Sequence, residues 1–208
     1  VIGGQHRRLE VAHAKLAASR AYLLVAYYAQ AHEMLFDAHA RAFAVFGGVP
    51  RRGIYDNMKT AVDKVGKGKA RNVNARFHAM TGHYLFESDF CNVASGWEKG
   101  QVADVWQQER GHLMALPKPF DGYVEQPARV TTTALIHFQR NRYSVPCEWV
   151  NAVVSLRAYA SKLRLIGPGG AAVELTRSFD RDQTFYDWQH YIGLLERKPG
   201  ALRNGAPF

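Results

Sequence analysis

The chain has 208 residues, and its 27 lysines and arginines outnumber 18 acidic residues, which gives a formal net charge of +9 at pH 7. A hydrophobic fraction of 47% is enough for one or two packed domains and excludes disorder throughout. No apolar run approaches the roughly 18 to 20 residues of a membrane-spanning helix, and the histidines and cysteines lack zinc-ligand spacing. The positive charge instead indicates a polyanionic partner.

The first segments predict a strand pair followed by a helix. Residues 5–16 and 20–29 are expected to form an antiparallel pair, because the second segment is rich in Tyr, Leu and Val. From 31 to 46, apolar residues recur at spacings of three and four, which predicts a helix. Gly47 and Gly48 then stop the pattern.

Three further elements are expected before residue 91. Residues 53–62 predict a strand with its following turn, and 72–81 predict a shorter helix whose Phe77 and Met80 belong to the core. The apolar residues at 84–86 suggest another short strand.

The second half changes to a β pattern. A linker is expected over 103–122, where prolines forbid a continuous helix. Beyond it, short runs rich in Val, Thr, Tyr and Ile predict a small, strongly bent β-barrel over 123–182, and an aromatic and basic tail follows over 183–208. The predicted strands are 123–124, 131–138, 141–145, 152–159, 162–166 and 171–175.

Asp56 is the candidate catalytic residue, because it ends a short apolar run and lies among cations. A carboxylate at a strand end is a hard ligand suited to Mg²⁺, which proteins usually hold with one or two carboxylates plus substrate phosphates. The alternative is that Asp56-Asn57 begins a turn, which these residues do well.

The positive charge gathers around this carboxylate. Residues 41–76 contain nine basic and two acidic side chains, and the glycine-interrupted cations of 64–71 suit contact with a phosphate backbone. The alternative is a solvated loop, and cations on barrel strands also serve to block aggregation at sheet edges. The candidate DNA-contacting residues are Arg51, Arg52, Lys59, Lys67, Lys69, Arg71, Arg142, Lys162 and Arg164.

Several segments along the chain, taken in order, resemble transposases of the insertion-sequence 21 family, the IstA proteins that work with an IstB ATPase. The resemblance implies an RNase H-like integrase core, in which two Asp and one Glu bind two Mg²⁺ ions and join transposon ends to target DNA, followed by a β-barrel. The segments are 32–39, the surroundings of Asp56, 71–77, 92–100, 119–125, 140–146 and 186–208.

The departures from this family pattern concern the catalytic carboxylates. The chain begins at Val1, which the resemblance places after the strand that carries the first Asp. The family's Lys-Gly-x-Val-Glu motif is cut short, because Lys99-Gly100-Gln101-Val102 runs into Ala103 and a segment that the family carries further downstream. An internal loss of several tens of residues explains this junction. Only Asp56 of the triad remains, and neither Glu98 nor Asp104, the possible substitutes, occupies the expected position.

The resulting expectation is an α/β plus all-β protein, with a partial RNase H-like core over 1–102. Such a sheet without its first strand and last helix leaves an edge unpaired. We expect a transposase that is catalytically inactive in this chain, or alternatively a non-catalytic remnant that binds DNA or docks to full-length transposase or its ATPase. Expected partners are DNA, an IstB-type ATPase and further copies, without a membrane, in the bacterial cytoplasm near the nucleoid.

Overall fold

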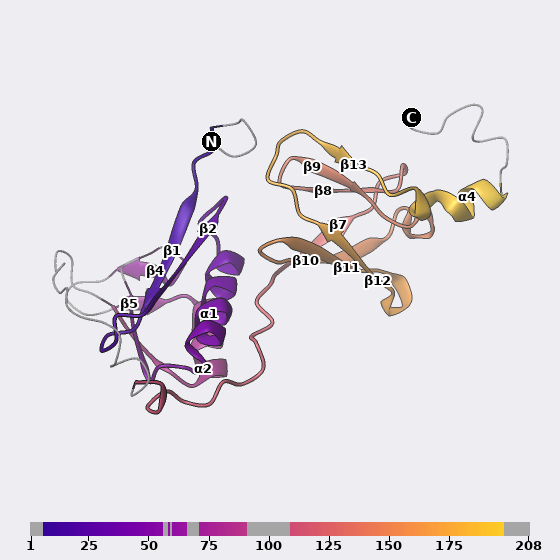
Figure 1. Cartoon of the computed structure of the whole chain (residues 1–208). Helices are drawn as coiled ribbons and strands as arrows, with labels where there is room; N and C mark the ends of the chain where they lie inside the picture. Colours follow the sequence, from indigo (N-terminus) through magenta and orange to yellow (C-terminus); the bar gives the residue numbers. More distant parts are fainter. Residues whose placement is uncertain (1–5, 56–57, 59, 66–70, 91–108, 198–208) are drawn as a thin grey trace. The chain divides into compact units, whose positions relative to one another are not determined.

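The chain folds into two compact units, residues 1–123 and 124–208 (Figure 1). The computed structural model describes residues 6–55, 58, 60–65, 71–90 and 109–197, with the backbone alone for 62–65, 71, 72 and 197. Each unit has its own cluster of buried apolar side chains. None of the described helices is long and apolar enough to cross a membrane.

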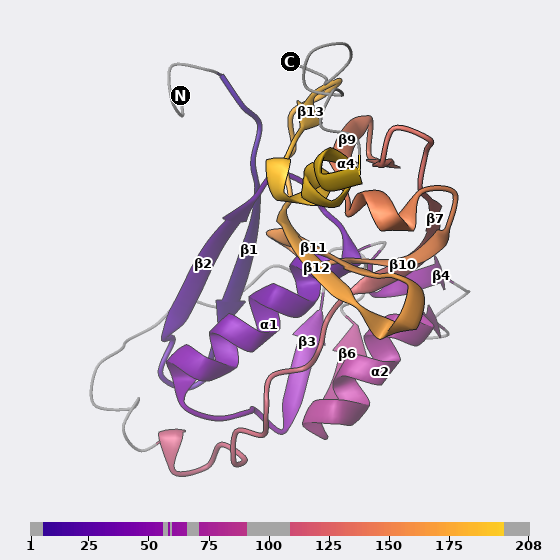
Figure 2. The ribbon, with the colours of Figure 1, turned by 90° about the vertical axis from the view of Figure 1, so that its right-hand side faces the viewer.

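The amino-terminal unit, residues 1–123, combines two helices with three pairs of strands. Strands β1 and β2 pair antiparallel, β3 and β6 pair parallel, and β4 and β5 pair antiparallel. Figure 2 shows both the β1–β2 pair and the β3–β6 pair beside α1. The elements are β1 (Glu10–Lys15), β2 (Tyr22–Tyr27), α1 (His32–Phe46), β3 (Arg52–Tyr55), β4 (Val62–Val65), β5 (Arg71–Val73), α2 (Ala75–Tyr84) and β6 (Glu87–Phe90).

Helix α1 confirms the helix predicted from apolar spacing, to within one residue at its start. It ends because Gly47 adopts a left-handed conformation, with φ of 75°, that lets its N–H reach the carbonyls of Phe43 and Ala44. A residue without Cβ takes this conformation without strain, which is why glycine commonly ends helices.

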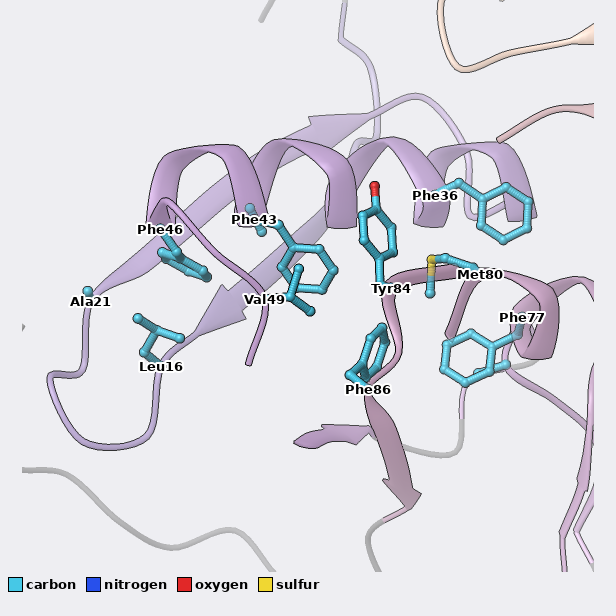
Figure 3. Close-up of a cluster of buried hydrophobic side chains, with 12 residues drawn as sticks. Leu16, Ala21, Phe36, Phe43, Phe46, Val49, Phe77, Met80, Tyr84 and Phe86 are labelled. Atoms are coloured by element: carbon cyan, nitrogen blue, oxygen red, sulfur yellow. The ribbon is translucent and has the colours of Figure 1, made fainter. Parts of the chain in front are cut away.

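The buried face of α1 forms one side of the amino-terminal core. Phe36, Phe43 and Phe46 project from it, and Figure 3 shows Phe77, Met80, Tyr84 and Phe86 on the facing segments. Phe77 and Met80 are completely buried, as predicted. The rings of Phe43 and Tyr84 meet edge to face with centroids 4.9 Å apart, an arrangement that aromatic pairs prefer. This aromatic packing ties α1 to α2.

Two predicted boundaries in this unit were wrong, whereas the strand and following turn predicted over 53–62 are confirmed. Strand β3 ends at Tyr55, the Ala61 N–H bonds to the Met58 carbonyl at 3.0 Å, and β4 begins at Val62 to pair with β5. The helix expected over 72–81 begins at Ala75, because Asn72 belongs to β5 and Asn74 caps the helix by accepting the Arg76 N–H at 3.0 Å. The strand expected at 84–86 begins only at Glu87.

Residues 109–123, most of which fall in the predicted linker, contact the amino-terminal unit. The Glu109 carboxylate accepts the backbone N–H groups of Ala18 and Ser19, at 3.2 and 2.8 Å, in the turn between β1 and β2. Val49 and Met114 form an isolated antiparallel bridge. This segment therefore contributes to the first unit's structure.

The carboxyl-terminal unit, residues 124–208, contains two sheets around one core. Strands run in the order β12-β11-β10-β7 in one sheet and β13-β9-β8 in the other. Leu156, Leu163 and Leu165 of the first sheet and Ile136 and Tyr143 of the second are all at most 1% exposed. The strands are β7 (Val124–Arg129), β8 (Leu135–Phe138), β9 (Asn141–Ser144), β10 (Val153–Ala158), β11 (Lys162–Ile166), β12 (Ala172–Thr176) and β13 (Thr184–Phe185).

The predicted strand positions in this unit are confirmed, with two changed bounds. The run at 123–124 extends to Arg129 as β7. The run at 131–138 loses its first half, since Thr131 Oγ1 accepts the Leu135 N–H in a turn and Ala134 has φ of 57°. The hydrogen bond from the Thr131 side chain to the backbone therefore favours a turn at 131–134 over the predicted strand.

The segment after β12 packs onto this same unit. Arg177 is 5% exposed, with its guanidinium over the rings of Phe138 and Phe179, and it donates to the carbonyl of Tyr159. A short 3₁₀ turn, Trp188–Tyr191, then leads into α4, Ile192–Arg197. Tyr191 is largely buried. The first part of the predicted tail is therefore anchored to its own unit.

Candidate functional site

The end of β3 leads directly into Asp56 and is held by buried polar contacts. The Tyr55 hydroxyl lies 2.8 Å from Nε2 of His39 in α1, and His39 Nδ1 lies 2.7 Å from the carbonyl oxygen of Leu35. Because a carbonyl can only accept, Nδ1 carries the ring hydrogen and Nε2 accepts from the Tyr55 hydroxyl. Burial lowers the pKa of His39 and raises that of Tyr55, which favours these neutral forms.

Aromatic rings hold the same strand end from other sides. The Tyr55 ring meets Phe77 of α2 edge to face at 5.0 Å and lies 6.0 Å from Phe90 of β6. Tyr55 therefore joins α1, α2 and β6. The sequence did not predict that His39 supports Tyr55. The seven-residue spacing of His32 and His39 does not indicate a contact with a strand that follows. Asp56 itself lies outside the described residues, so its catalytic and metal-binding roles stay predictions.

The two arginines predicted to contact DNA near Asp56 lie at the start of β3. Both are exposed, and Arg52 forms an ion pair with Asp89 of the neighbouring strand β6. Arg52 and Tyr55 are three residues apart on the strand, which corresponds to about 10 Å. These cations therefore flank the opposite end of β3 from the one that continues into Asp56.

The basic segment 64–71 lies at the hairpin of β4 and β5. Val65 pairs with Arg71 across this hairpin, and residues 66–70 connect the two strands. Lys59, Lys67 and Lys69 lie outside the described residues, as does the side chain of Arg71. Their contact with DNA therefore stays a prediction.

Arg142 lies on the outer face of the three-stranded sheet. It is exposed, and its cross-strand neighbours are His137 of β8 and Thr184 of β13. Its neighbours in sequence, Asn141 and Tyr143, point into the core, as the alternation of a strand requires.

Lys162 and Arg164 lie on β11 of the four-stranded sheet. They are therefore on a different sheet from Arg142, which lies on β9. The Lys162 ammonium contacts both oxygens of Glu174 on β12, at 3.0 and 3.1 Å. Arg164 pairs across the sheet with Arg157 of β10 and with Glu174. Two arginines opposite each other concentrate positive charge here, whereas Glu174 offsets part of it.

A polar hollow beside the β8–β9 turn adds residues that sequence reasoning did not select. It has a volume of about 310 Å³ and is lined by Gln139, Arg140 and residues 178–181. Arg140 forms an exposed ion pair with Asp182 at 3.2 Å. The only sequence signal for this hollow is the run of alternating charge from Arg177 to Asp182.

No three His, Cys, Asp or Glu side chains gather in the described part of the chain in a way that could hold a metal ion. Two-metal catalysis needs carboxylates that hold ions about 3.5–4 Å apart. The described residues therefore do not fit a two-Mg²⁺ centre. Asp56, Glu98 and Asp104 lie outside them.

Comparison with known proteins places these features in a family. The Mu transposase C-terminal domain family matches residues 116–187, which include β7 to β13. A transposase of Aminobacter aminovorans is 47% identical over the whole chain, and a transposase for insertion sequences IS1326/IS1353 from Pseudomonas aeruginosa is 48% identical, also over the whole chain. A transposase for insertion sequence IS21 from Pseudomonas aeruginosa is 28% identical over 59% of the chain and 31% of its own length. The chain belongs to the insertion-sequence 21 family of transposases.

Within this family, the chain spans about half the length of the curated relatives it matches, 51% of each of the first two. The Aminobacter alignment covers 261 residues, whereas the chain has 208, so 53 aligned positions (261 less 208) have no residue in the chain. In total, these positions are as many as the internal loss of several tens of residues that the interrupted Lys-Gly motif predicts.

Proposed function

We propose that the chain is a DNA-binding part of an insertion-sequence transposase and does not cut DNA by itself. The observation that carries the proposal is the 47–48% identity to transposases across the whole chain. The net charge of +9 supports the same conclusion, because neutralising phosphates is the main source of sequence-independent affinity for DNA. Exposed arginines on both units, including Arg51 and Arg142, provide such contacts.

The proposal includes a partial RNase H-like integrase core in the amino-terminal unit. A strand pair, a helix and two parallel strands joined through the β4–β5 hairpin and a second helix, in the order β1-β2-α1-β3-β4-β5-α2-β6, support it. In the complete enzyme, such a core would integrate DNA by strand transfer at a two-Mg²⁺ site of two Asp and one Glu. In this chain Asp56 is the one expected member of that set.

Further parts of the proposal concern partners and location. An IstB-type ATPase and further transposase copies are proposed partners, in the bacterial cytoplasm at the nucleoid. The alternative function is a module that docks to full-length transposase or its ATPase through the carboxyl-terminal segment. The exposed Tyr186 and Trp188 favour this alternative, because aromatic side chains are enriched at protein interfaces.

The deciding experiment measures binding of the purified chain to duplex DNA at 50 and 200 mM salt, with and without Mg²⁺, and follows nicking in the same samples. We expect binding that weakens steeply with salt, since each phosphate contact adds about −0.9 to the slope of log K against log salt. We expect no nicking. Mg²⁺-dependent nicking that disappears in Asp56→Asn would contradict the inactive assignment.

A matched pair of variants tests the basic hairpin. Lys67→Gln with Lys69→Gln should reduce the salt slope by about 2, because each phosphate-contacting cation contributes about 1. The control, Lys118→Gln with Arg129→Gln, removes the same charge from exposed positions elsewhere. An equal loss in both variants would assign binding to net charge alone, and salt-independent binding would favour the docking module.

A further inference from the structure

The polar hollow in the carboxyl-terminal unit lies between two segments that are distant in the sequence. One wall is the β8–β9 turn, Gln139 and Arg140, and the other is the segment 178–181, which follows β12. We call it the β8–β9 hollow. Its volume of about 310 Å³ is near the lower end of the roughly 300–1,000 Å³ that small-molecule sites have. A hollow of this size can hold one base or one nucleotide.

A buried amide fixes the second wall against β9. Asn141 is completely buried, and its side-chain amide donates to the carbonyl of Ser178 at 3.3 Å and to that of Asp180 at 2.7 Å. The Asp182 N–H donates to the carbonyl of Arg140 at 3.1 Å, which joins the two walls directly. The hollow is therefore formed before a ligand enters it, so binding needs little further ordering of the backbone.

The β8–β9 turn has two large residues in a backbone conformation that suits glycine. Gln139 and Arg140, the two residues between β8 and β9, have φ of 47° and 69°. A two-residue hairpin turn with positive φ at both positions strongly prefers Asn-Gly. Strained residues persist only where the surrounding structure holds them, and they gather at functional sites. The choice of residues at this turn therefore indicates a role for the two side chains.

An aromatic ring gives the hollow a flat apolar surface. Phe179 is part of the lining, and the Arg177 guanidinium lies over one face of its ring, 4.6 Å from the centroid. Arg177 is itself fixed, because it donates to the carbonyl of Tyr159 and to the side-chain oxygen of Gln139. A base would stack on the other face of the Phe179 ring, and such stacking is possible with every base because each has a π-face.

The polar groups of the lining suit a nucleotide better than a free anion. Arg181 forms no ion pair with any residue that the structure describes. Arg140 pairs with Asp182 but has five N–H donors, so both arginines can donate to a phosphate. The carboxylate of Asp180 would repel a free phosphate, whereas it can accept from the amino group of a base. The Gln139 oxygen is occupied by Arg177, which leaves its amide N–H groups to donate to a base.

We propose that the β8–β9 hollow binds one unpaired nucleotide of DNA, with the base against Phe179 and the phosphate at Arg140 and Arg181. A base inside a duplex must first leave the stack, whereas an unpaired base does not have this cost. The Asp180 carboxylate favours a base with an amino group, such as guanine. The inference rests on the proposed DNA-binding function and adds to it a preference for DNA that contains an unpaired nucleotide.

The test measures binding of the full chain to two short fluorescein-labelled duplexes by fluorescence anisotropy. One duplex has a single bulged guanine, and the other is the same duplex with that guanine paired. We expect the bulged duplex to bind at least about fivefold more tightly, since this is the lower limit of the affinity that stacking one base contributes.

Two matched pairs of variants locate the site. Phe179→Leu keeps an apolar side chain beside Arg177 but removes the ring, and Arg181→Gln removes an exposed charge from the hollow. Each should abolish most of the preference for the bulged duplex. The controls are Phe185→Leu and Arg129→Gln, which change an exposed ring and an exposed arginine of the same unit outside the hollow. Both controls should keep the preference of the wild type.

Amide chemical shifts of the wild-type chain supply a second readout that needs no variant. Titration with deoxyguanosine monophosphate should shift the amides of Gln139, Arg140 and residues 178–181 to saturation. Inorganic phosphate over the same concentrations should shift them far less, because it has no base to contact Phe179 and Asp180.

Three results would overturn the proposal. They are equal binding of the bulged and paired duplexes, an equal loss of preference in Phe179→Leu and Phe185→Leu, and equal amide shifts with phosphate and nucleotide. The last result would assign the hollow to a simple anion. If the chain instead bound neither duplex while the nucleotide still shifted the amides of the hollow, the proposed function would fail and the nucleotide site would stand.

Discussion

A buried histidine in the carboxyl-terminal unit links the strand β9 to the segment that follows the sheets. Ser144 Oγ accepts the Asp187 N–H at 2.7 Å and lies 3.0 Å from Nδ1 of His190. Since the hydroxyl has one hydrogen, it can donate it to Nδ1 of a neutral imidazole. Burial lowers the pKa of His190, although the nearby carboxylates of Asp187 and Glu148 act in the opposite direction.

This lowered pKa makes the stability of the unit depend on pH. The unfolded histidine has a pKa near 6.5, so below that pH the unfolded chain binds more protons than the folded one. The contribution of His190 to the free energy of unfolding is therefore greatest above pH 6.5. It decreases as the pH falls through 6.5 toward the lower pKa of the folded state. Each unit of difference between the two pKa values is worth about 1.4 kcal/mol.

His190→Gln removes this titration, so we expect a smaller loss of stability between pH 7.5 and 5 than in the wild type. Hydrogen exchange of β9 and β10 amides measures it. The matched control is His137→Gln, since His137 is exposed on the outer face of β8. A wild-type loss that His190→Gln leaves unchanged would show that another group is responsible.

At the scale of elements, the contact between the loop after α1 and residues 109–114 depends on one glycine. A Cβ at Gly48 would lie 2.7 Å from Leu113 Cβ and 2.7 Å from the Met114 carbonyl oxygen. Neither atom is the far end of a flexible side chain. The Val49–Met114 bridge next to it has hydrogen bonds of 3.0 and 2.8 Å. The absence of a side chain at Gly48 is therefore what permits this close approach.

Gly48→Ala should destabilise the amino-terminal unit by about 1–3 kcal/mol, because it overpacks a buried contact. Gly82 is the matched control, since a Cβ there meets no atom within 4 Å. Gly82→Ala should instead stabilise the same unit by about 1 kcal/mol, because alanine favours a helix interior such as that of α2. Urea unfolding of the two variants measures both effects, and shifts of the same sign would contradict the argument.

Some elements were predictable because their signal is local. Helix α1 has regular apolar spacing and a glycine stop, and the strands of the second unit have alternating patterns between turn residues. The start of α2 was less clear, since both Asn72 and Asn74 can cap a helix and only the pairing of β5 with β4 selects Asn74. The support of Tyr55 by His39 joins two distant elements through tertiary packing, which a local pattern does not report.

The same distinction applies to the candidate site. The sequence located exposed cations such as Arg142. It did not predict that Lys162 forms an ion pair with Glu174, because this cross-strand pair depends on the register of β11 and β12. Nor did it predict that 109–123 would contact the first unit, because that contact joins residues about 90 positions apart.

At the scale of the whole molecule, the two units differ in how their sheets support them. The amino-terminal unit has only two-stranded pairs among its described strands, whereas the carboxyl-terminal unit has sheets of four and three strands around one core. A two-stranded pair is marginal by itself, and sheets of three or more strands with an apolar face are much more stable. The first unit therefore depends mainly on the aromatic packing between α1 and α2.

We accordingly expect two transitions in urea, with a lower midpoint for the amino-terminal unit than for the carboxyl-terminal unit. Hydrogen exchange of the amides of each unit measures the two midpoints. Because the clusters of buried residues are separate, residues 124–208 alone should keep the midpoint that they show in the full chain. A single coincident transition would show that the two units fold as one.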